Sequence, residues 1–218
     1  YLTEAAGMVE NKSDVNYYLN LGIAVNKAFH GKFFNYETGQ YGTGSQCSNA
    51  LPLFLEMIRD IRHEWGLRWF KSETQAFTNL VKDVEAHGNR LTTGDVGNRY
   101  LFQTLAKQGF NELLYKMFNH DEAPGYGFQL KFGATTLTEQ WDPRKGSSWN
   151  HFMMGQIDEW FFNSLAGIES DSDEKGFKKI RIRPQPVGDL TSVKASTQTP
   201  YGEVRVSWKR SGNDFTID

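Results

Sequence analysis

The sequence has few features of a disulfide-stabilised, membrane-spanning or nucleic-acid-binding protein. Its one cysteine, Cys47, excludes an intrachain disulfide, and its polar neighbours favour a small packed residue. No apolar run is long enough to cross a bilayer, so we expect no membrane partner. A formal net charge of -2 argues against a nucleic-acid partner, which would favour a basic face. We therefore expect a soluble protein, and its compartment stays open.

Motifs for metal, phosphate or serine chemistry are also missing. The five histidines show no metal-ligand spacing, and His63-Glu64 is not followed by the second histidine of a zincin motif. Gly42-Thr43-Gly44 lacks the third glycine and the lysine of phosphate-binding loops. No serine stands between two glycines as in a nucleophile elbow. We therefore expect no metal and no cofactor.

Aromatic residues are abundant, including 6 Trp and 16 Phe. Two interpretations stay open: a large helical core, and a carbohydrate cleft in which ring faces stack on sugars. The pattern of apolar residues predicts helices over 13–28, 49–61, 72–86, 100–109 and 110–118. Ser13 is the expected N-cap of the first helix, and Pro52 is expected in the first turn of the second. A short strand is expected around 127–132.

The segment 125–165, GYGFQLKFGATTLTEQWDPRKGSSWNHFMMGQIDEWFFNSL, contains the strongest candidate site. Its first part is a polar turn that ends in Glu139 beside Trp141. Its second part predicts a helix, with Asn150 and His151 near the start. The expected apolar stripe consists of Trp149, Phe152, Met153, Ile157, Trp160, Phe161 and Leu165. A carboxylate, an indole and an imidazole at a junction of loop and helix are suited to binding a sugar.

Glu139 is the leading catalytic candidate because it is the only charged residue in the run 132–141, where burial can tune its pKa. Glycoside hydrolysis needs two carboxyl groups. In an inverting enzyme one protonates the leaving oxygen and the other deprotonates a water, and the two stand about 6.5–9.5 Å apart. An N-capping or salt-bridging role for Glu139 stays open.

Other polar residues also have two interpretations each. Asp142 competes as the base, but Asp-Pro is also a common turn starter. Asp95 could bind sugar hydroxyls or cap a helix. His151 could hydrogen-bond a sugar hydroxyl or be structural. Asp158 is expected to be solvated or ion-paired.

The C-terminal part changes character. A charged linker is expected over 169–175, and after it apolar residues alternate with polar ones, which predicts half-buried antiparallel strands. The alternating apolar positions are Ile180, Ile182, Val204, Val206, Trp208, Phe215 and Ile217. Too few strands are present to bury a full sandwich core. Because the chain begins with Tyr1 and its strand pattern stops at Asp218, we expect a piece of a longer protein.

Three stretches carry a family resemblance: QCSNALPLFL at 46–55, LTTGDVGNRYLFQTL at 91–105, and GATTLTEQWD, WNHFMMGQIDEW and LAGI within 133–168. With these motifs the chain resembles the C-terminal half of bacterial alpha-L-rhamnosidases. The resemblance implies a mainly α fold with a C-terminal β region. It places part of an (α/α)6 barrel over 1–168 and the start of an incomplete antiparallel β-sandwich over 169–218.

The resemblance also implies roles for residues. It makes Glu139 the general base of an inverting hydrolysis of terminal alpha-L-rhamnosides, and it makes His151 a contact of the rhamnose. Trp141 lies in the same motif, and we add Asp95 and Asn150 to the expected substrate-binding residues. The general acid of the family lies in an upstream motif that this chain lacks, so the isolated chain is expected to be inactive. A carbohydrate is the expected partner.

Two features depart from the family pattern, namely a short connection between 142 and 149 and an acid, Asp95, where the family often has an apolar residue. They leave specificity beyond rhamnose open. The alternatives are another helical-barrel glycosidase with a different sugar and a non-catalytic carbohydrate-binding or scaffold module. A helical-repeat interaction protein is disfavoured because no self-similar period is present. Oligomeric state, aglycone and compartment, bacterial cytoplasm or periplasm, stay open.

Overall fold

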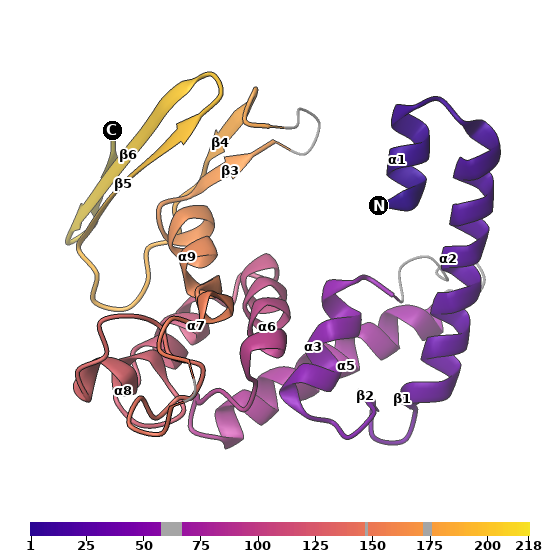
Figure 1. Cartoon of the computed structure of the whole chain (residues 1–218), viewed down its shortest axis with the longest axis horizontal. Helices are drawn as coiled ribbons and strands as arrows, with labels where there is room; N and C mark the ends of the chain where they lie inside the picture. Colours follow the sequence, from indigo (N-terminus) through magenta and orange to yellow (C-terminus); the bar gives the residue numbers. More distant parts are fainter. Residues whose placement is uncertain (58–66, 147, 172–175) are drawn as a thin grey trace. The chain divides into compact units, whose positions relative to one another are not determined.

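The computed structural model describes residues 1–57, 67–146, 148–171 and 176–218 (Figure 1). This part of the chain is mainly helical, with short strands near its C-terminal end. The expected fold class, helices followed by an antiparallel strand region, is confirmed. The chain divides into two compact units, Tyr1–Ala86 and His87–Asp218. All five expected site residues belong to the second unit.

The first unit consists of helices and a minimal hairpin. Its elements are α1 (Leu2–Met8), α2 (Lys12–Phe33), β1 (Phe34–Asn35), β2 (Gln40–Tyr41), α3 (Gln46–Phe54) and α5 (Leu67–Ala86). Figure 1 shows α1 lying against α2, and α3 packs on α5. At the end of α2, the buried His30 contacts Tyr41 through Nδ1 and the phenol oxygen at 2.7 Å. Burial raises the pKa of Tyr41.

The start of α2 corrects a prediction. Asn11, not Ser13, is the N-cap, and its side-chain oxygen accepts a hydrogen bond from the backbone N–H of Asp14 at 3.2 Å. Asparagine serves this role as well as serine does, so the first capable residue before the apolar pattern takes the position. Leu19 of this helix is 46% exposed.

The boundaries of α3 differ from the prediction as well. Ser45 has an extended backbone and accepts from the N–H of Ser48 at 3.2 Å, so the helix begins at Gln46. Pro52 therefore lies inside the helix and not in its first turn. The helix ends at Phe54, and residues 58–61 of the expected helix lie outside the described part.

The second unit begins with a helical layer. Its helical elements are α6 (Asp95–Lys107), α7 (Asn111–Phe118), α8 (Tyr126–Lys131), the 3-10 turn η2 (Phe152–Met154), α9 (Gln156–Trp160) and the π-helical η3 (Phe161–Leu165). The strand expected around 127–132 is wrong, because α8 occupies this segment. Its buried positions, Tyr126 and Gln129, are three residues apart, whereas Leu130 is 71% exposed. Gly133 follows with φ +79°, a left-handed conformation that favours glycine after a helix.

The continuous helix expected over 149–165 is also wrong. Helical structure begins at Phe152 and changes type at Gly155 and Phe161. Trp149 and Phe152, which were assigned to the buried stripe, are 67% and 86% exposed. The buried side is formed by Met154, Ile157, Trp160 and Leu165. Residues 148–151 are not helical, and the N–H of His151 is bonded to the carbonyl of Leu137, as described below.

The core of the helical layer fixes α9 against α6 and α7. Trp160 is 3% exposed, and its indole Nε1 donates to Oδ1 of Asn111 at 2.8 Å. Its ring meets Phe118 edge to face with centroids 5.1 Å apart, and Phe118 meets Phe102 in the same way at 4.7 Å. Such pairs add to the free energy gained from apolar burial. This core holds the beginning of α6 and the beginning of α9 close together.

Two small antiparallel sheets follow. One pairs β3 (Ile168–Ser170) with β4 (Ile180–Ile182), and the other has the order β5 (Ser192–Thr199), β6 (Gly202–Ser211) and β7 (Asp214–Ile217). The alternation in β6 is confirmed, since Val206 and Trp208 are buried. Trp208 also donates from Nε1 to the carbonyl of Leu165 at 2.8 Å, which ties this sheet to the end of η3.

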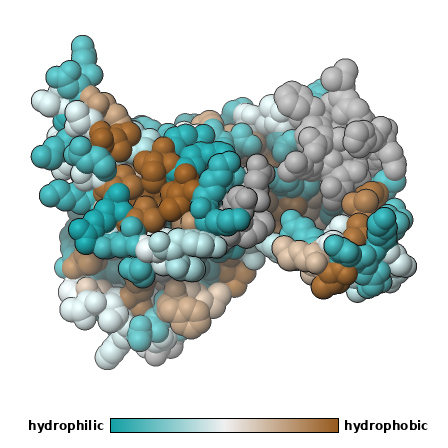
Figure 2. Space-filling view, turned by 90° about the horizontal axis from the view of Figure 1, so that it is seen from above, coloured by the Kyte–Doolittle hydropathy of each residue, from teal (hydrophilic) through white to brown (hydrophobic). Residues whose placement is uncertain are grey.

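Other strand predictions need correction. β5 was not expected, because its alternation consists of short and polar residues. β3 overlaps the first two residues of the expected linker, of which 172–175 fall outside the described residues. Phe215 and Ile217 are 43% and 46% exposed, so β7 is not half-buried. Figure 2 shows apolar surface, in brown, over the region of these strands. No helix of the described residues is long and apolar enough to cross a membrane.

Candidate active site

Glu139 lies on a loop that folds back on itself. The backbone N–H of Glu139 donates to the carbonyl of Ser148 at 3.0 Å, and the N–H of His151 donates to the carbonyl of Leu137 at 2.8 Å. The hydroxyl of Thr136 donates to the carbonyl of Trp149. These bonds pair residues 136–139 with residues 148–151 in opposite directions. They bring the backbone of His151 beside that of Leu137, two positions before Glu139.

His151 and Asp95 form a polar pair at the start of α6. His151 Nε2 lies 3.2 Å from Oδ2 of Asp95, and the two side chains are 22% and 37% exposed. The backbone carbonyl of Asp95 accepts from Nε2 of Gln156 at 2.8 Å. Gly94 is the N-cap of α6, so Asp95 is a residue of the first helical turn and not the cap. The structure thus joins two predicted site residues that are 56 positions apart.

Trp141 is held by the same two regions. Its indole Nε1 donates to the carbonyl of Thr93 at 3.4 Å, and its ring meets Tyr126 edge to face at 5.2 Å. Tyr126 is 7% exposed and donates from its hydroxyl to the carbonyl of Met154 at 2.8 Å. Burial raises the pKa of Tyr126, and the negative charge of Asp158 raises it further. Trp141 therefore stands half-buried between the start of α6 and the loop that carries Glu139.

The positions of the other expected residues differ in exposure. Glu139 is half-buried, and Asn150 is exposed next to His151. Asp158 is exposed, as expected, and lines a hollow of about 390 Å³ between α8 and α9. Its neighbour Glu159 pairs with Arg99 of α6 at 3.2 Å. The backbone N–H of Glu139 is fixed by its bond to Ser148.

Asp142, the competing acid of the loop, is committed to a neighbouring cation. The guanidinium of Arg144 donates to both of its carboxylate oxygens, at 2.8 and 2.9 Å. These hydrogen bonds lower the pKa of Asp142 to about 2. The N–H of Arg144 also donates to Oδ1 at 3.1 Å, which closes the turn that the Asp-Pro pair predicts. A carboxylate of such low basicity is a poor general base.

Gln129 of α8 is a further residue of the site that the sequence did not predict. Gln129 is 2% exposed, and its Nε2 donates to the carbonyls of Thr138 and Gln140 at 3.1 and 3.2 Å. Its Oε1 accepts from the N–H of Thr138 at 3.4 Å. These partners flank Glu139 on both sides. The sequence predicts a strand for this segment, and in that interpretation a glutamine carries no signal. Its buried position follows only from the helix that the structure shows.

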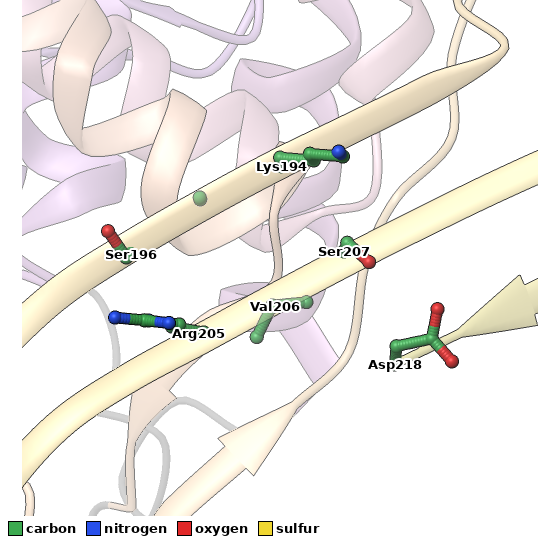
Figure 3. Close-up of a pocket in the computed structure, with 7 residues that line it drawn as sticks. Lys194, Ser196, Arg205, Val206, Ser207 and Asp218 are labelled. Carbon is green, nitrogen blue, oxygen red and sulfur yellow. The ribbon is translucent and has the colours of Figure 1, made fainter.

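A second hollow lies on the C-terminal sheet. It measures about 460 Å³, and Figure 3 shows Lys194, Ser196, Arg205 and Ser207 along β5 and β6 with Asp218 at the end of β7. Lys194, Ser196 and Arg205 are exposed, and Arg205 is paired with Glu203 at 2.7 Å. Exposed polar side chains on a flat sheet are a weaker candidate than the loop of Glu139, where buried groups converge.

Comparison with known proteins assigns the chain to a family. Residues 1–165 match the model of the bacterial alpha-L-rhamnosidase 6 hairpin glycosidase domain, and residues 167–218 match that of the bacterial alpha-L-rhamnosidase C-terminal domain. The chain belongs to the bacterial alpha-L-rhamnosidase family. The resemblance based on the three sequence stretches is thereby confirmed. The fold agrees with a partial helical barrel followed by a β domain.

Individual relatives agree with this assignment. An alpha-L-rhamnosidase of Formosa agariphila is 30% identical over 215 residues, which cover 94% of this chain and 22% of that protein. One of Streptomyces avermitilis is 26% identical over 209 residues, or 92% of this chain and 19% of that protein. The chain thus spans about a fifth of the curated relatives that it matches.

Solved structures have the same fold. The alpha-L-rhamnosidase from Dictyoglumus thermophilum superimposes with a TM-score of 0.86 and 32% identity, over 99% of this chain and 23% of that one. The Streptomyces avermitilis enzyme, solved in complex with L-rhamnose, also gives a TM-score of 0.86 over 99% of this chain and 20% of that one. Its 24% identity supports the fold alone. The division of this chain into 1–168 and 169–218 stays a prediction.

Proposed function

We propose that this chain is part of an inverting alpha-L-rhamnosidase in which Glu139 is the general base. The observation that carries the proposal is the pairing of the loop that holds Glu139. Its N–H is bonded to Ser148, and the next pair in the ladder joins Leu137 to His151. A carboxylate on a fixed and half-buried backbone, in a family of glycosidases, is suited to orient a water molecule.

In the proposed step, the carboxylate of Glu139 accepts one proton. The carboxylate takes a proton from a water, and the water oxygen forms a bond to the anomeric carbon as the bond from that carbon to the leaving oxygen, on the opposite face, breaks. The leaving oxygen receives a proton from a second carboxyl group, which this account places outside the chain. Because one carboxyl group cannot do both tasks at once, we propose that the 218-residue chain alone does not turn over a rhamnoside.

The polar pair and the indole are proposed to bind the sugar. When neutral His151 donates from Nε2 to Asp95, its Nδ1 is left as an acceptor for a hydroxyl. Trp141 would present its ring as an apolar wall, since Tyr126 and the carbonyl of Thr93 fix its orientation. Asn150, exposed beside His151, is proposed as a further polar contact.

The proposal is tested in the full-length protein with a panel of aryl glycosides. We expect turnover of the aryl alpha-L-rhamnoside and little turnover of the matching glucoside or uronide. The Glu139→Gln variant should lower kcat by roughly 10²–10⁴-fold, the usual contribution of one acid–base group. Glu203→Gln is the matched control, because Glu203 lies on β6 in an exposed ion pair.

Three results would contradict this proposal. Near-normal kcat in Glu139→Gln would remove Glu139 from the role. Preference for a different aryl glycoside would indicate another helical-barrel glycosidase. Sugar binding without any turnover by the full-length protein would indicate a carbohydrate-binding module.

A further inference from the structure

The side chain of Gln129 makes an unusual set of contacts. It projects from α8, nine positions before Thr138, and is buried, as is Thr138 at 3% exposure. All of its three hydrogen bonds described above go to backbone atoms of Thr138 and Gln140, the two neighbours of Glu139 in sequence. The hydroxyl of Thr138 reinforces the arrangement by donating to the carbonyl of Gln140 at 2.7 Å.

The orientation of this carboxamide follows from its partners. Nε2 faces two carbonyl oxygens, which only accept, and Oε1 faces an N–H, which only donates. Rotating the amide by half a turn would place oxygen against two oxygens. The amide is therefore fixed in one orientation, and three of its four possible hydrogen bonds are made.

Together with Ser148, Gln129 restrains the main chain around the acid. Gln129 holds the N–H and carbonyl of Thr138 and the carbonyl of Gln140, while the N–H of Glu139 is bonded to Ser148. The peptide group between Thr138 and Glu139 is thus anchored twice, its carbonyl by Gln129 and its N–H by Ser148, and the carbonyl of Gln140 is anchored by Gln129 as well.

We propose that Gln129 is a positioning residue for Glu139, a carboxamide clamp that sets where the carboxylate meets water. The inference rests on the proposed function of Glu139. A glutamine is suited to this task because it supplies two donors and one acceptor without a charge. A nearby carboxylate or ammonium group would shift the pKa of the base, whereas a neutral clamp fixes geometry and leaves the pKa to the rest of the site.

The test uses the full-length protein and an aryl alpha-L-rhamnoside. Gln129→Met keeps the length of the side chain and removes its polar atoms. We expect kcat to fall by roughly 10²-fold, the loss that follows a displacement of about 1 Å, while KM changes by less than about threefold. Gln198→Met on β5 is the matched control, since Gln198 is exposed on the C-terminal sheet and should keep wild-type kcat.

A second variant separates positioning from folding. Gln129→Glu is isosteric, and its protonated carboxyl can still donate one hydrogen bond and accept another. When this carboxyl ionises, it faces two carbonyl oxygens without a donor. We therefore expect kcat/KM to fall as pH rises through the pKa of the introduced carboxyl, so that the pH profile moves to lower pH than in wild type. A purely structural role would lower the melting temperature without moving this profile.

The double variant Gln129→Met/Glu139→Gln distinguishes this inference from the function on which it rests. If Gln129 acts through Glu139, adding Gln129→Met to Glu139→Gln lowers kcat by less than about threefold. The same 10²-fold loss in both backgrounds, kcat of Gln129→Met within twofold of wild type, or an unmoved pH profile in Gln129→Glu would each overturn the inference. Near-normal kcat in Glu139→Gln alone would instead overturn the proposed function.

Discussion

Glu139 and Asp142 lie three positions apart on one loop, and their surroundings separate their roles. Asp142 is bound by both arms of the Arg144 guanidinium, which lowers its pKa to about 2. Arg144 is itself held over the ring of Phe132 at 3.9 Å. Asp142 is thus a structural anion that closes the turn after Trp141, and Glu139 remains the better candidate for the base.

This division of roles predicts different kinetics for the two acids. In the full-length protein, Asp142→Asn should lower kcat by less than about tenfold, because a carboxylate of such low basicity contributes little proton transfer. Glu139→Gln should cost far more. Steady-state rates on an aryl alpha-L-rhamnoside measure both. Equal losses of kcat in the two variants would contradict the assignment of Glu139, rather than Asp142, as the base.

The Asp95–His151 pair predicts coupled effects. If Asp95 orients the imidazole, His151→Ala should lower kcat/KM by roughly 2- to 13-fold, since one hydrogen bond is worth about 0.5–1.5 kcal/mol. Asp95→Ala should then add little in the His151→Ala background, because residues that act as one unit are not additive. A double-mutant cycle on kcat/KM measures this coupling. Strictly additive losses would show that the two side chains act separately.

At the scale of residues, the sequence predicted candidates but not their partners. Glu139, Trp141 and His151 could be proposed because their types and their motif indicate sugar chemistry. Their grouping with Asp95 depends on the contact between α6 and the loop before α9, which no local pattern encodes. Gln129 was missed because an amide in a short apolar segment gives no signal until its buried partners are known.

At the scale of elements, the long helices were predictable but not their starts: α5 begins at Leu67 and α6 at Asp95, each five residues before the predicted start, and the irregular helices were not predictable. α7 and the end of α5 agree with the sequence pattern, since glycine or polar breaks follow sustained apolar periodicity. The segment 149–165 was misassigned because spacing alone cannot show that Trp149 and Phe152 are exposed. Residues 149–151 are not helical, and the N–H of His151 is bonded instead to the carbonyl of Leu137.

One buried contact between elements predicts a change in stability. Asn111 at the start of α7 accepts from the indole of Trp160 in α9 at 2.8 Å. Asn111→Ala leaves the buried indole N–H without this acceptor, which should cost about 1–3 kcal/mol of unfolding free energy. Thermal or denaturant unfolding of the full-length protein measures the loss. Asn213→Ala in the exposed β6–β7 turn is the control, and equal stability of the two variants would contradict the assigned role of this contact.

At the scale of the whole molecule, this chain supplies one side of a proposed reaction. It spans about a fifth of the relatives that it matches, and our proposal places the general acid in another part of the protein. Residues 1–165 match the 6 hairpin glycosidase domain, and residues 167–218 match the C-terminal domain. Within the second unit, the bond from Trp208 to Leu165 joins the end of the helical layer to the sheet. The catalysis that we propose is therefore a property of the full-length protein.

The most direct test of Glu139 as the base is chemical rescue in the full-length Glu139→Ala variant. Removing the base leaves water without an acceptor for its proton, whereas azide is an anion that attacks without deprotonation. We expect azide to raise the rate on an aryl alpha-L-rhamnoside with a good leaving group, and the product to be the rhamnosyl azide of inverted, beta configuration. No response to azide, or a product of retained alpha configuration, would contradict the account.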